Sequence, residues 1–199
     1  MKLTSEFGIN VFVMKPDFVT RGLRTLVCRR LRDGGFSILA SRRKRLSRSE
    51  VAYWYQLEFE RDFPLGAADP RAQPHIDYLV SGDCWALLVQ HKSLLGASLF
   101  DFSRQVRGTH YLPRECEPGS LRFDLRDPNL NSIEYVTIDN LYFEPIPRNG
   151  IHCATSEVEL AKCINIFFSD LWVGGIFNTQ SHITSCGAPL QMNSKGLSM

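Results

Sequence analysis

The sequence has no apolar run long enough to cross a membrane, no Cys-x-x-Cys pair and no internal repeat. A membrane-spanning helix needs about 20 mostly apolar residues in succession, so this sequence does not predict a membrane protein. Its six cysteines lie far apart, and nothing in it resembles a secretory signal peptide. We therefore expect reduced thiols, a cytoplasmic location and no membrane contact.

An excess of charge of one sign is also missing, because the formal net charge of the 199 residues is only +2. A charge this small does not by itself imply a nucleic-acid partner. Residues 21–48 are nevertheless densely basic, with Asp33 as the only acid. We interpret this segment as solvated faces of a helix and a strand, with 42–45 along a strand edge where charge blocks pairing. The apolar and charged fractions are close to average, which favours one domain with a buried core.

The stretch from residue 148 to 156 holds a candidate for chemistry. His152 lies just ahead of Ser156 and Glu159, whose spacing is typical of a capping box before an apolar helical run. A helix N-terminus attracts phosphate and disfavours an imidazolium ion, so the ring would stay neutral and nucleophilic. Taken alone, however, this stretch favours a histidine that merely caps a turn.

A second candidate lies near the beginning of the chain. Residues 8–14 alternate and are rich in Val, Ile and Phe, which predicts a buried strand. Lys15 follows directly, where a loop can aim its ammonium group at a phosphate, and Pro16 stops the strand. Thr20 is expected to cap the next helix.

The rest of the chain alternates between helical and extended patterns. Further strands are predicted at 36–40 and 84–90, a hairpin at 131–143 with its turn at Asp139-Asn140, and helices after Thr20, after Ser47-Glu50, at 76–80, at 94–102 and after Ser156. This order fits an α+β sandwich with helices over an antiparallel sheet. The pattern alone leaves a doubly wound sheet open.

Three motifs together resemble the nucleoside diphosphate kinase family. They are Lys15-Pro16-Asp17 at the end of a strand, Pro118-Gly119-Ser120-Leu121-Arg122, and Asn149-Gly150-Ile151-His152. The family's own motifs read Lys-Pro-Asp-Gly, Pro-Gly-Thr-Ile-Arg and Asn-Ile-Ile-His-Gly-Ser-Asp. The resemblance implies a ferredoxin-like sandwich with a four-stranded antiparallel sheet covered by helices. It would occupy residues 1–168, with insertions at about 65–74 and 127–147, the second holding the added hairpin. Residues 169–199 would form an extension that is flexible or contacts another subunit.

The same resemblance implies an activity: the γ-phosphate of ATP passes to a nucleoside diphosphate through a phosphohistidine, here on His152. Mg²⁺ would travel with the nucleotide, and the chain would form a homo-oligomer. No Walker A or protein-kinase signature points to another phosphate-binding family. The other residues that the resemblance assigns to the nucleotide are Lys15, Arg104 and Arg122 for phosphate charge, Thr109 and Tyr55 as hydrogen-bond donors, Phe63 near the base and Asn149 near the ribose. Thr109 belongs to Arg107-Gly108-Thr109, which resembles the family's Leu-Gly-x-Thr turn.

Several positions depart from the family pattern. Ala154 replaces a serine two places after the histidine, Cys153 and Phe18 replace glycines, and Cys163 stands where the family has a glutamate that orients the histidine. A thiol is a poor substitute for that carboxylate, but Glu159 lies one turn earlier and would replace it if it faced inward. These departures leave an alternative open, a nucleotide-binding regulatory or scaffold protein with weak or no turnover. The preferred base and sugar of the acceptor also stay open.

Overall fold

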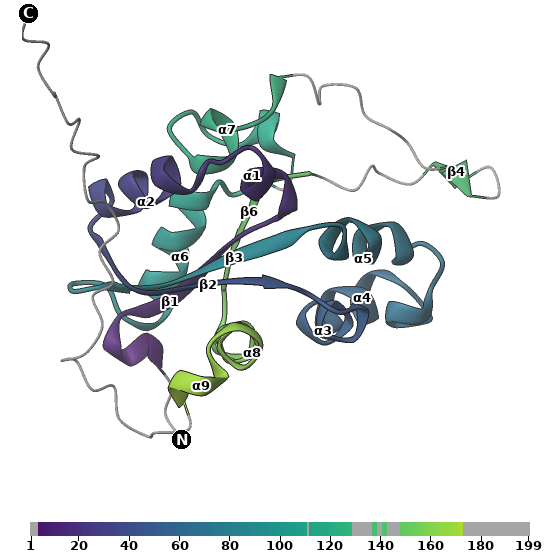
Figure 1. The fold of residues 1–199 in the computed structure, drawn as a ribbon, viewed down its shortest axis with the longest axis horizontal. Helices are drawn as coiled ribbons and strands as arrows, with labels where there is room; N and C mark the ends of the chain where they lie inside the picture. Colours follow the sequence, from purple (N-terminus) through teal and green to yellow (C-terminus); the bar gives the residue numbers. More distant parts are fainter. Residues whose placement is uncertain (1–3, 111, 129–136, 139–140, 143–147, 173–199) are drawn as a thin grey trace, which may run out of the picture.

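Four antiparallel strands in the order β2-β3-β1-β6 form the central sheet of the computed structural model (Figure 1). The structure describes residues 4–110, 112–128, 137–138, 141–142 and 148–172. The strands are β1 (Ile9–Met14), β2 (Phe36–Arg45), β3 (Asp83–His91) and β6 (Ile151–Cys153). Every pair in this sheet is antiparallel, which confirms the predicted α+β class and excludes a doubly wound sheet.

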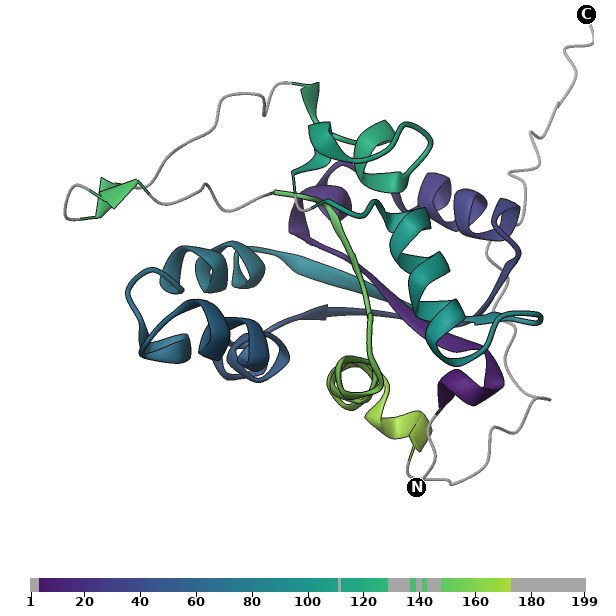
Figure 2. The ribbon, with the colours of Figure 1, turned by 180° about the vertical axis from the view of Figure 1, so that it is seen from behind.

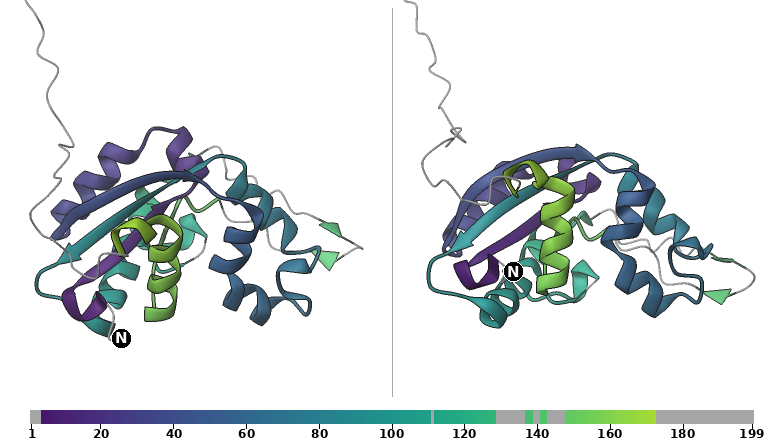
Figure 3. Two further views of the ribbon diagram at one scale, coloured as in Figure 1. Left: turned by 60° about the horizontal axis from the view of Figure 1, so that its bottom comes forward. Right: turned by 90° about the horizontal axis from the view of Figure 1, so that it is seen from below.

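Both faces of the sheet are covered, so the chain has two apolar cores (Figure 2). Successive side chains of a strand point to opposite faces. In β1, Val11 and Val13 accordingly lie in one core, and Phe12 and Met14 lie in the other. Figure 3 shows α8 on one side of the sheet and α2 on the other. The α-helices are α1 (Pro16–Thr20), α2 (Arg24–Asp33), α3 (Arg48–Trp54), α4 (Gln56–Asp62), α5 (Gln73–Val80), α6 (Gly96–Arg107), α7 (Leu121–Asp124), α8 (Glu157–Phe167) and α9 (Ser169–Trp172). Short 3-10 turns lie at Thr4–Phe7, Gly66–Ala68 and Pro113–Glu115.

The first core is built by β1 and β3 with helices α3, α4, α5 and α8, and the second by the same strands with α2, α6 and α7. The helices α3 to α5 lie together at one end of the strands in Figure 1. Helix α3 begins as predicted, because Ser47 and Glu50 form both hydrogen bonds of a capping box.

Some predicted boundaries were wrong. Thr20 ends α1, and the helix expected to follow it begins only at Arg24, with no side-chain cap. Strand β2 runs five residues beyond the predicted end at Ala40, to Arg45, because its backbone stays paired with β3 as far as Asp83. The basic residues 42–45 therefore lie on an edge strand, as predicted. Helix α6 extends to Arg107 and so contains Arg104; it ends at Gly108, whose φ of 110° a helix does not adopt.

The inserted segments are described only in part. The predicted hairpin is confirmed by an antiparallel pair, β4 (Thr137–Ile138) and β5 (Leu141–Tyr142), while its turn at 139–140 lies outside the described residues. In the extension, only α9 is described, so the division at residue 168 stays a prediction. Within the described ranges, no helix combines the length and apolar character that crossing a bilayer requires.

Candidate active site

Strand β6 positions His152 at the edge of the sheet. The strand pairs with β1, where His152 lies opposite Val13. Because side chains alternate, Ile151 and Cys153 enter the core with α2 and α6, and His152 points to the opposite face, toward α3. There its ring meets the edges of Trp54 and Tyr55, at centroid distances of 5.1 and 5.9 Å. The simpler interpretation of a turn-capping histidine is therefore wrong.

The carboxylate of Glu159 supports the His152 ring from behind. His152 Nε2 lies 2.8 Å from Glu159 Oε1. The other carboxylate oxygen accepts hydrogen bonds from the Thr155 amide and hydroxyl, at 2.7 and 2.8 Å. Only half of the predicted capping box is present, because Ser156 accepts from the Glu159 amide but the carboxylate turns inward. No described residue forms a hydrogen bond with the second ring nitrogen, Nδ1.

The ionisation states of this pair follow from burial and from their contact. Burial lowers the pKa of His152, which is only 6% exposed, more than the charge of Glu159 raises it. Burial by itself would raise the pKa of Glu159, but the nearby His152 ring and the hydrogen bonds from Thr155 lower it to about 2. The ring is therefore neutral and the carboxylate ionised at neutral pH. Burial produces the neutral ring, rather than the helix N-terminus that the sequence suggested.

Lys15 and Asn149 meet beside the histidine strand. The Lys15 ammonium group is 2% exposed and donates to Asn149 Oδ1 at 2.8 Å. Burial, followed by the positive charge of Arg122, lowers the pKa of Lys15 to about 7. The backbone joins the two motifs as well, since the Lys15 amide donates to the Gly150 carbonyl at 2.8 Å. Tyr55 lies under this group, with Lys15 Nζ 5.6 Å from its ring centroid.

Arg122 is held next to the same strand by backbone carbonyls. Its Nε donates to Ile151 O at 3.1 Å, and Nη1 donates to His110 O at 2.6 Å. Burial and then the charge of Arg107 lower the pKa of Arg122 to about 10. Among the described residues, no carboxylate lies within 4 Å of Lys15 or Arg122. The site therefore combines a neutral histidine with buried cations whose charge is not neutralised, an arrangement that suits an anion.

Comparison with known proteins agrees with this geometry. The sequence matches the family model described as "Nucleoside diphosphate kinase" over residues 10–172. The chain belongs to the nucleoside diphosphate kinase family. A nucleoside diphosphate kinase of Desulfatibacillum aliphaticivorans is 29% identical over 163 residues, which cover 82% of this chain and 96% of that protein. One of Francisella philomiragia is 24% identical over 163 residues, covering 82% and 94%.

A solved structure supports the fold assignment independently. The nucleoside diphosphate kinase of Encephalitozoon cuniculi aligns with a TM-score of 0.58 at 18% identity, over 84% of this chain and 89% of that one. Together with the sheet order, this likeness confirms the predicted ferredoxin-like sandwich.

Two departures from the nucleoside diphosphate kinase pattern are accommodated by packing. Phe18 is buried against Gly150, where a Cβ atom would lie 1.7 Å from the Phe18 ring. Gly150 also has a φ of 67°, a backbone angle that residues with a side chain rarely adopt, so glycine is required there. Cys163 is buried in the core, and burial raises the pKa of its thiol, so it cannot act as an anionic partner of the histidine. Glu159, facing inward, occupies that place instead.

Three residues that the nucleoside diphosphate kinase resemblance assigned to the nucleotide are not brought into this group. Arg104 is exposed and pairs with Asp101, and the Thr109 hydroxyl donates to Glu117. Phe63 packs against Phe59 and lies under the guanidinium group of Arg71, 5.4 Å from the ring centroid. Their roles in nucleotide binding stay predictions, because none of these contacts joins them to the group around His152.

The structure adds a histidine that the sequence reasoning missed. The ring centroid of His75 on α5 lies 4.6 Å from that of Tyr55, and its buried Nε2 has no hydrogen-bond partner among the described residues. Burial and then the charges of Lys15 and His152 lower the pKa of His75 to about 3. A single histidine in a helical pattern resembles any core residue, so no sequence signal marked it. The buried Tyr55 hydroxyl likewise lacks a hydrogen-bond partner within the described ranges, and burial raises its pKa well above the usual value.

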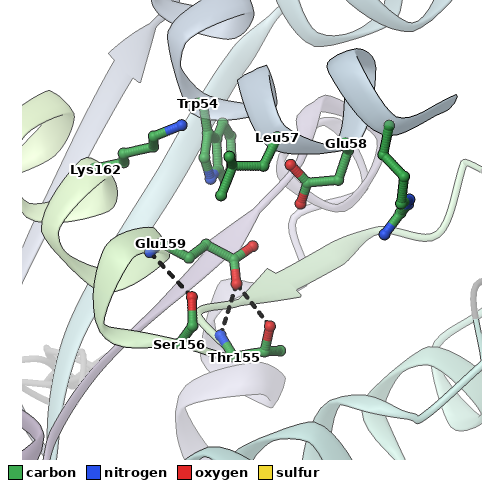
Figure 4. A pocket seen from close by; sticks show the side chains of 8 residues that line it. Trp54, Leu57, Glu58, Thr155, Ser156, Glu159 and Lys162 are labelled. Atoms are coloured by element: carbon green, nitrogen blue, oxygen red, sulfur yellow. Dashed lines mark hydrogen bonds between the residues drawn. The ribbon is translucent and has the colours of Figure 1, made fainter. Parts of the chain in front are cut away.

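A cavity of about 270 Å³ adjoins the Glu159 carboxylate (Figure 4). Figure 4 shows Glu58 of α4 on the opposite side of the cavity from Glu159, with Trp54 and Lys162 nearby. The lining residues are Trp54, Leu57, Glu58, Arg61, Thr155, Ser156, Glu159 and Lys162. Because Trp54 and Glu159 both touch the imidazole, this cavity belongs to the surroundings of His152.

Proposed function

We propose that this protein is a nucleoside diphosphate kinase that moves the γ-phosphate of ATP to a nucleoside diphosphate through a phosphohistidine on His152. The observation that carries the proposal is the 2.8 Å contact between His152 Nε2 and Glu159. A carboxylate at one ring nitrogen favours the tautomer with its proton there, which leaves a lone pair on Nδ1. Orientation by Glu159 would compensate for Cys163, one of the departures that favour a binding protein without turnover.

The chemistry consists of two displacements at phosphorus. In the first, the Nδ1 lone pair forms a bond to the γ-phosphorus of ATP, and the bond to the β–γ bridging oxygen breaks with its electrons leaving on ADP. The ring then carries positive charge next to ionised Glu159, which stabilises it. In the second, the terminal oxygen of a nucleoside diphosphate attacks the same phosphorus, and the N–P bond breaks to restore the neutral ring.

The cations supply what phosphoryl transfer asks of a protein, namely placement and charge compensation. Arg122, fixed by two carbonyls, would bind phosphate oxygens, and Lys15 would do so once a phosphate restores its proton. Tyr55 keeps its proton and is a hydrogen-bond donor. Asn149 orients Lys15, and its predicted contact with the ribose stays a prediction.

Magnesium is expected to enter with the nucleotide as part of the substrate. Across the described ranges, no group of three or more His, Cys, Asp or Glu side chains could hold a metal ion. Mg²⁺ usually keeps several waters and binds through substrate phosphates, which needs few protein ligands. Homo-oligomer formation and a cytoplasmic location stay predictions.

A pulse–chase experiment tests the proposal. Incubation with γ-labelled ATP is expected to give an acid-labile, alkali-stable label on the protein. Addition of an unlabelled nucleoside diphosphate should transfer that label to the corresponding triphosphate. Stabilisation by nucleotide without any label or product would instead support the regulatory or scaffold alternative.

Glu159→Gln should slow formation of the phosphohistidine about 100-fold, because the amide keeps the shape but cannot balance the charge on the ring. Since Glu159 acts through His152, kcat should fall while KM for ATP stays within about twofold. Glu159→Asp, which restores the charge, should recover part of the rate. Glu58→Gln is the matched control, because Glu58 lines the same cavity without an ion pair to His152. Equal kcat values for the two glutamine variants would contradict the assignment.

A further inference from the structure

We infer that Arg107, rather than Arg104, supplies the second guanidinium group that binds the phosphates of the nucleotide. The inference rests on the proposed function and names a residue that the family pattern does not mark, since Arg107 stands at the leucine of the Leu-Gly-x-Thr turn. It starts from the different surroundings of two arginines in the last turn of α6.

Arg104 faces solvent. Its side chain is 51% exposed and pairs with Asp101 of the same helix at 3.3 Å. An exposed pair between residues three apart contributes little to stability, but it directs Arg104 along the helix surface. Arg107 is the last residue of α6 and is only 7% exposed.

The end of α6 brings the residue next to Arg107 into contact with Arg122. Arg107 Nε donates to the Gly108 carbonyl at 3.1 Å. Gly108 itself touches Arg122 so closely that an added Cβ would lie 3.0 Å from Arg122 Cβ. The charge of Arg107 accordingly helps to lower the pKa values of Arg122, His152 and Lys15. Arg107 therefore lies within electrostatic range of Arg122, His152 and Lys15.

No carboxylate compensates for this buried charge within the part of the chain that the structure describes. Arg107 takes part in no ion pair there, and its single hydrogen bond uses one of its five N–H donors. Burying like charges together without a counter-charge is costly. A phosphate group would satisfy the remaining donors and the excess charge at once, because guanidinium and phosphate match in geometry.

Binding of Mg–ADP and of inorganic triphosphate to the whole chain, measured by titration calorimetry, tests this inference. Arg107→Leu installs the residue typical of the family and should therefore fold. This variant is expected to raise the Kd for both ligands about 10-fold or more. The matched variant Arg104→Leu should change each Kd less than about twofold. Arg107→Lys should recover part of the affinity for triphosphate. Thermal unfolding without ligand shows whether each variant is folded.

The possible outcomes separate the inference from the proposed function. Equal losses in the two leucine variants, or a larger loss for Arg104→Leu, would overturn the role of Arg107. Failure of the unmodified protein to bind triphosphate would overturn it as well. If that protein binds both ligands in an Arg107-dependent way but is never labelled by ATP, the inference stands and the phosphotransferase proposal fails.

Discussion

Replacing His152 with alanine is expected to abolish the acid-labile label and to reduce nucleoside diphosphate kinase turnover at least about 10⁴-fold. No other group in the described part of the chain combines a neutral nucleophilic nitrogen with an orienting carboxylate: burial lowers the pKa of His152, and Glu159 lies 2.8 Å from Nε2. Without the imidazole, direct transfer between two nucleotides would need both in the site at once. Labelling with γ-labelled ATP and a coupled turnover assay measure the two effects.

His75 provides the matched control for this experiment. His75 is half-buried near Tyr55 and Lys15, with its Nε2 atom buried, but no carboxylate of the described residues pairs with it. His75→Gln should therefore keep the label, even if nucleotide binding weakens. If the label survives in His152→Ala and disappears in His75→Gln, the nucleophile is His75, and the mechanism proposed for His152 is wrong. Mapping the phosphorylated peptide distinguishes the two sites directly.

Lys15→Met should reduce kcat/KM about 10³-fold and, in the absence of nucleotide, stabilise the fold at pH 6 to 7. The loss of activity follows from removing a charge donor to the phosphates. The gain in stability follows from the cost of burying the ammonium group, which lowers the pKa of Lys15 from 10.5 to about 7. Replacing a buried charge by an apolar side chain of similar volume often stabilises a protein, by about 1–4 kcal/mol.

The direction of the pH dependence follows from this lowered pKa. Below pH 7, both the folded and the unfolded chain carry the Lys15 proton, and the full cost of burial is present. Between pH 7 and about 10.5, the unfolded chain keeps the proton that the folded chain has lost, so Lys15 makes the free energy of unfolding rise with pH. The advantage of Lys15→Met should therefore shrink from pH 6 to pH 10.

Denaturant unfolding at several pH values and steady-state kinetics measure both parts of this prediction. Lys162→Met is the control, because Lys162 is buried to a similar extent on α8 but lies by Gln56 and Tyr53. It should retain turnover close to that of the unmodified protein. A Lys15→Met variant with full activity would exclude the ammonium group from catalysis, and one whose stability difference does not vary with pH would contradict the lowered pKa.

The sequence predicted best where a motif constrains the backbone itself. Lys15 ends a strand before a proline, and Gly150 needs a positive φ against Phe18, so both motifs carry local information about their geometry. Alternation along residues 8–14 likewise predicts a strand, because successive side chains of a strand point to opposite faces, and this period of two does not depend on the neighbouring elements. The hairpin at Thr137–Ile138 and Leu141–Tyr142 was predicted on the same ground.

Side-chain direction in the last or first turn of a helix was not predictable in this way. Glu159 matched a capping box, but its carboxylate turned inward, where the Thr155 amide and hydroxyl and the His152 ring are its partners. Arg104 and Arg107 lie three residues apart, and the resemblance pointed to Arg104, whereas Arg107 is the buried one. Burial depends on how the end of α6 packs against Arg122. His75 approached Tyr55 only through the placement of α5 on α3.

By itself, the sequence predicted the family and, through that resemblance, the antiparallel α+β fold and the candidate histidine, because short motifs act through the local backbone. Strand alternation alone left a doubly wound sheet open. The tertiary structure alone decided which carboxylate supports His152, which cations are buried beside it and how far their pKa values move. Those properties arise from desolvation and from contacts between residues far apart in the chain, such as Lys15 with Asn149. No local pattern encodes them.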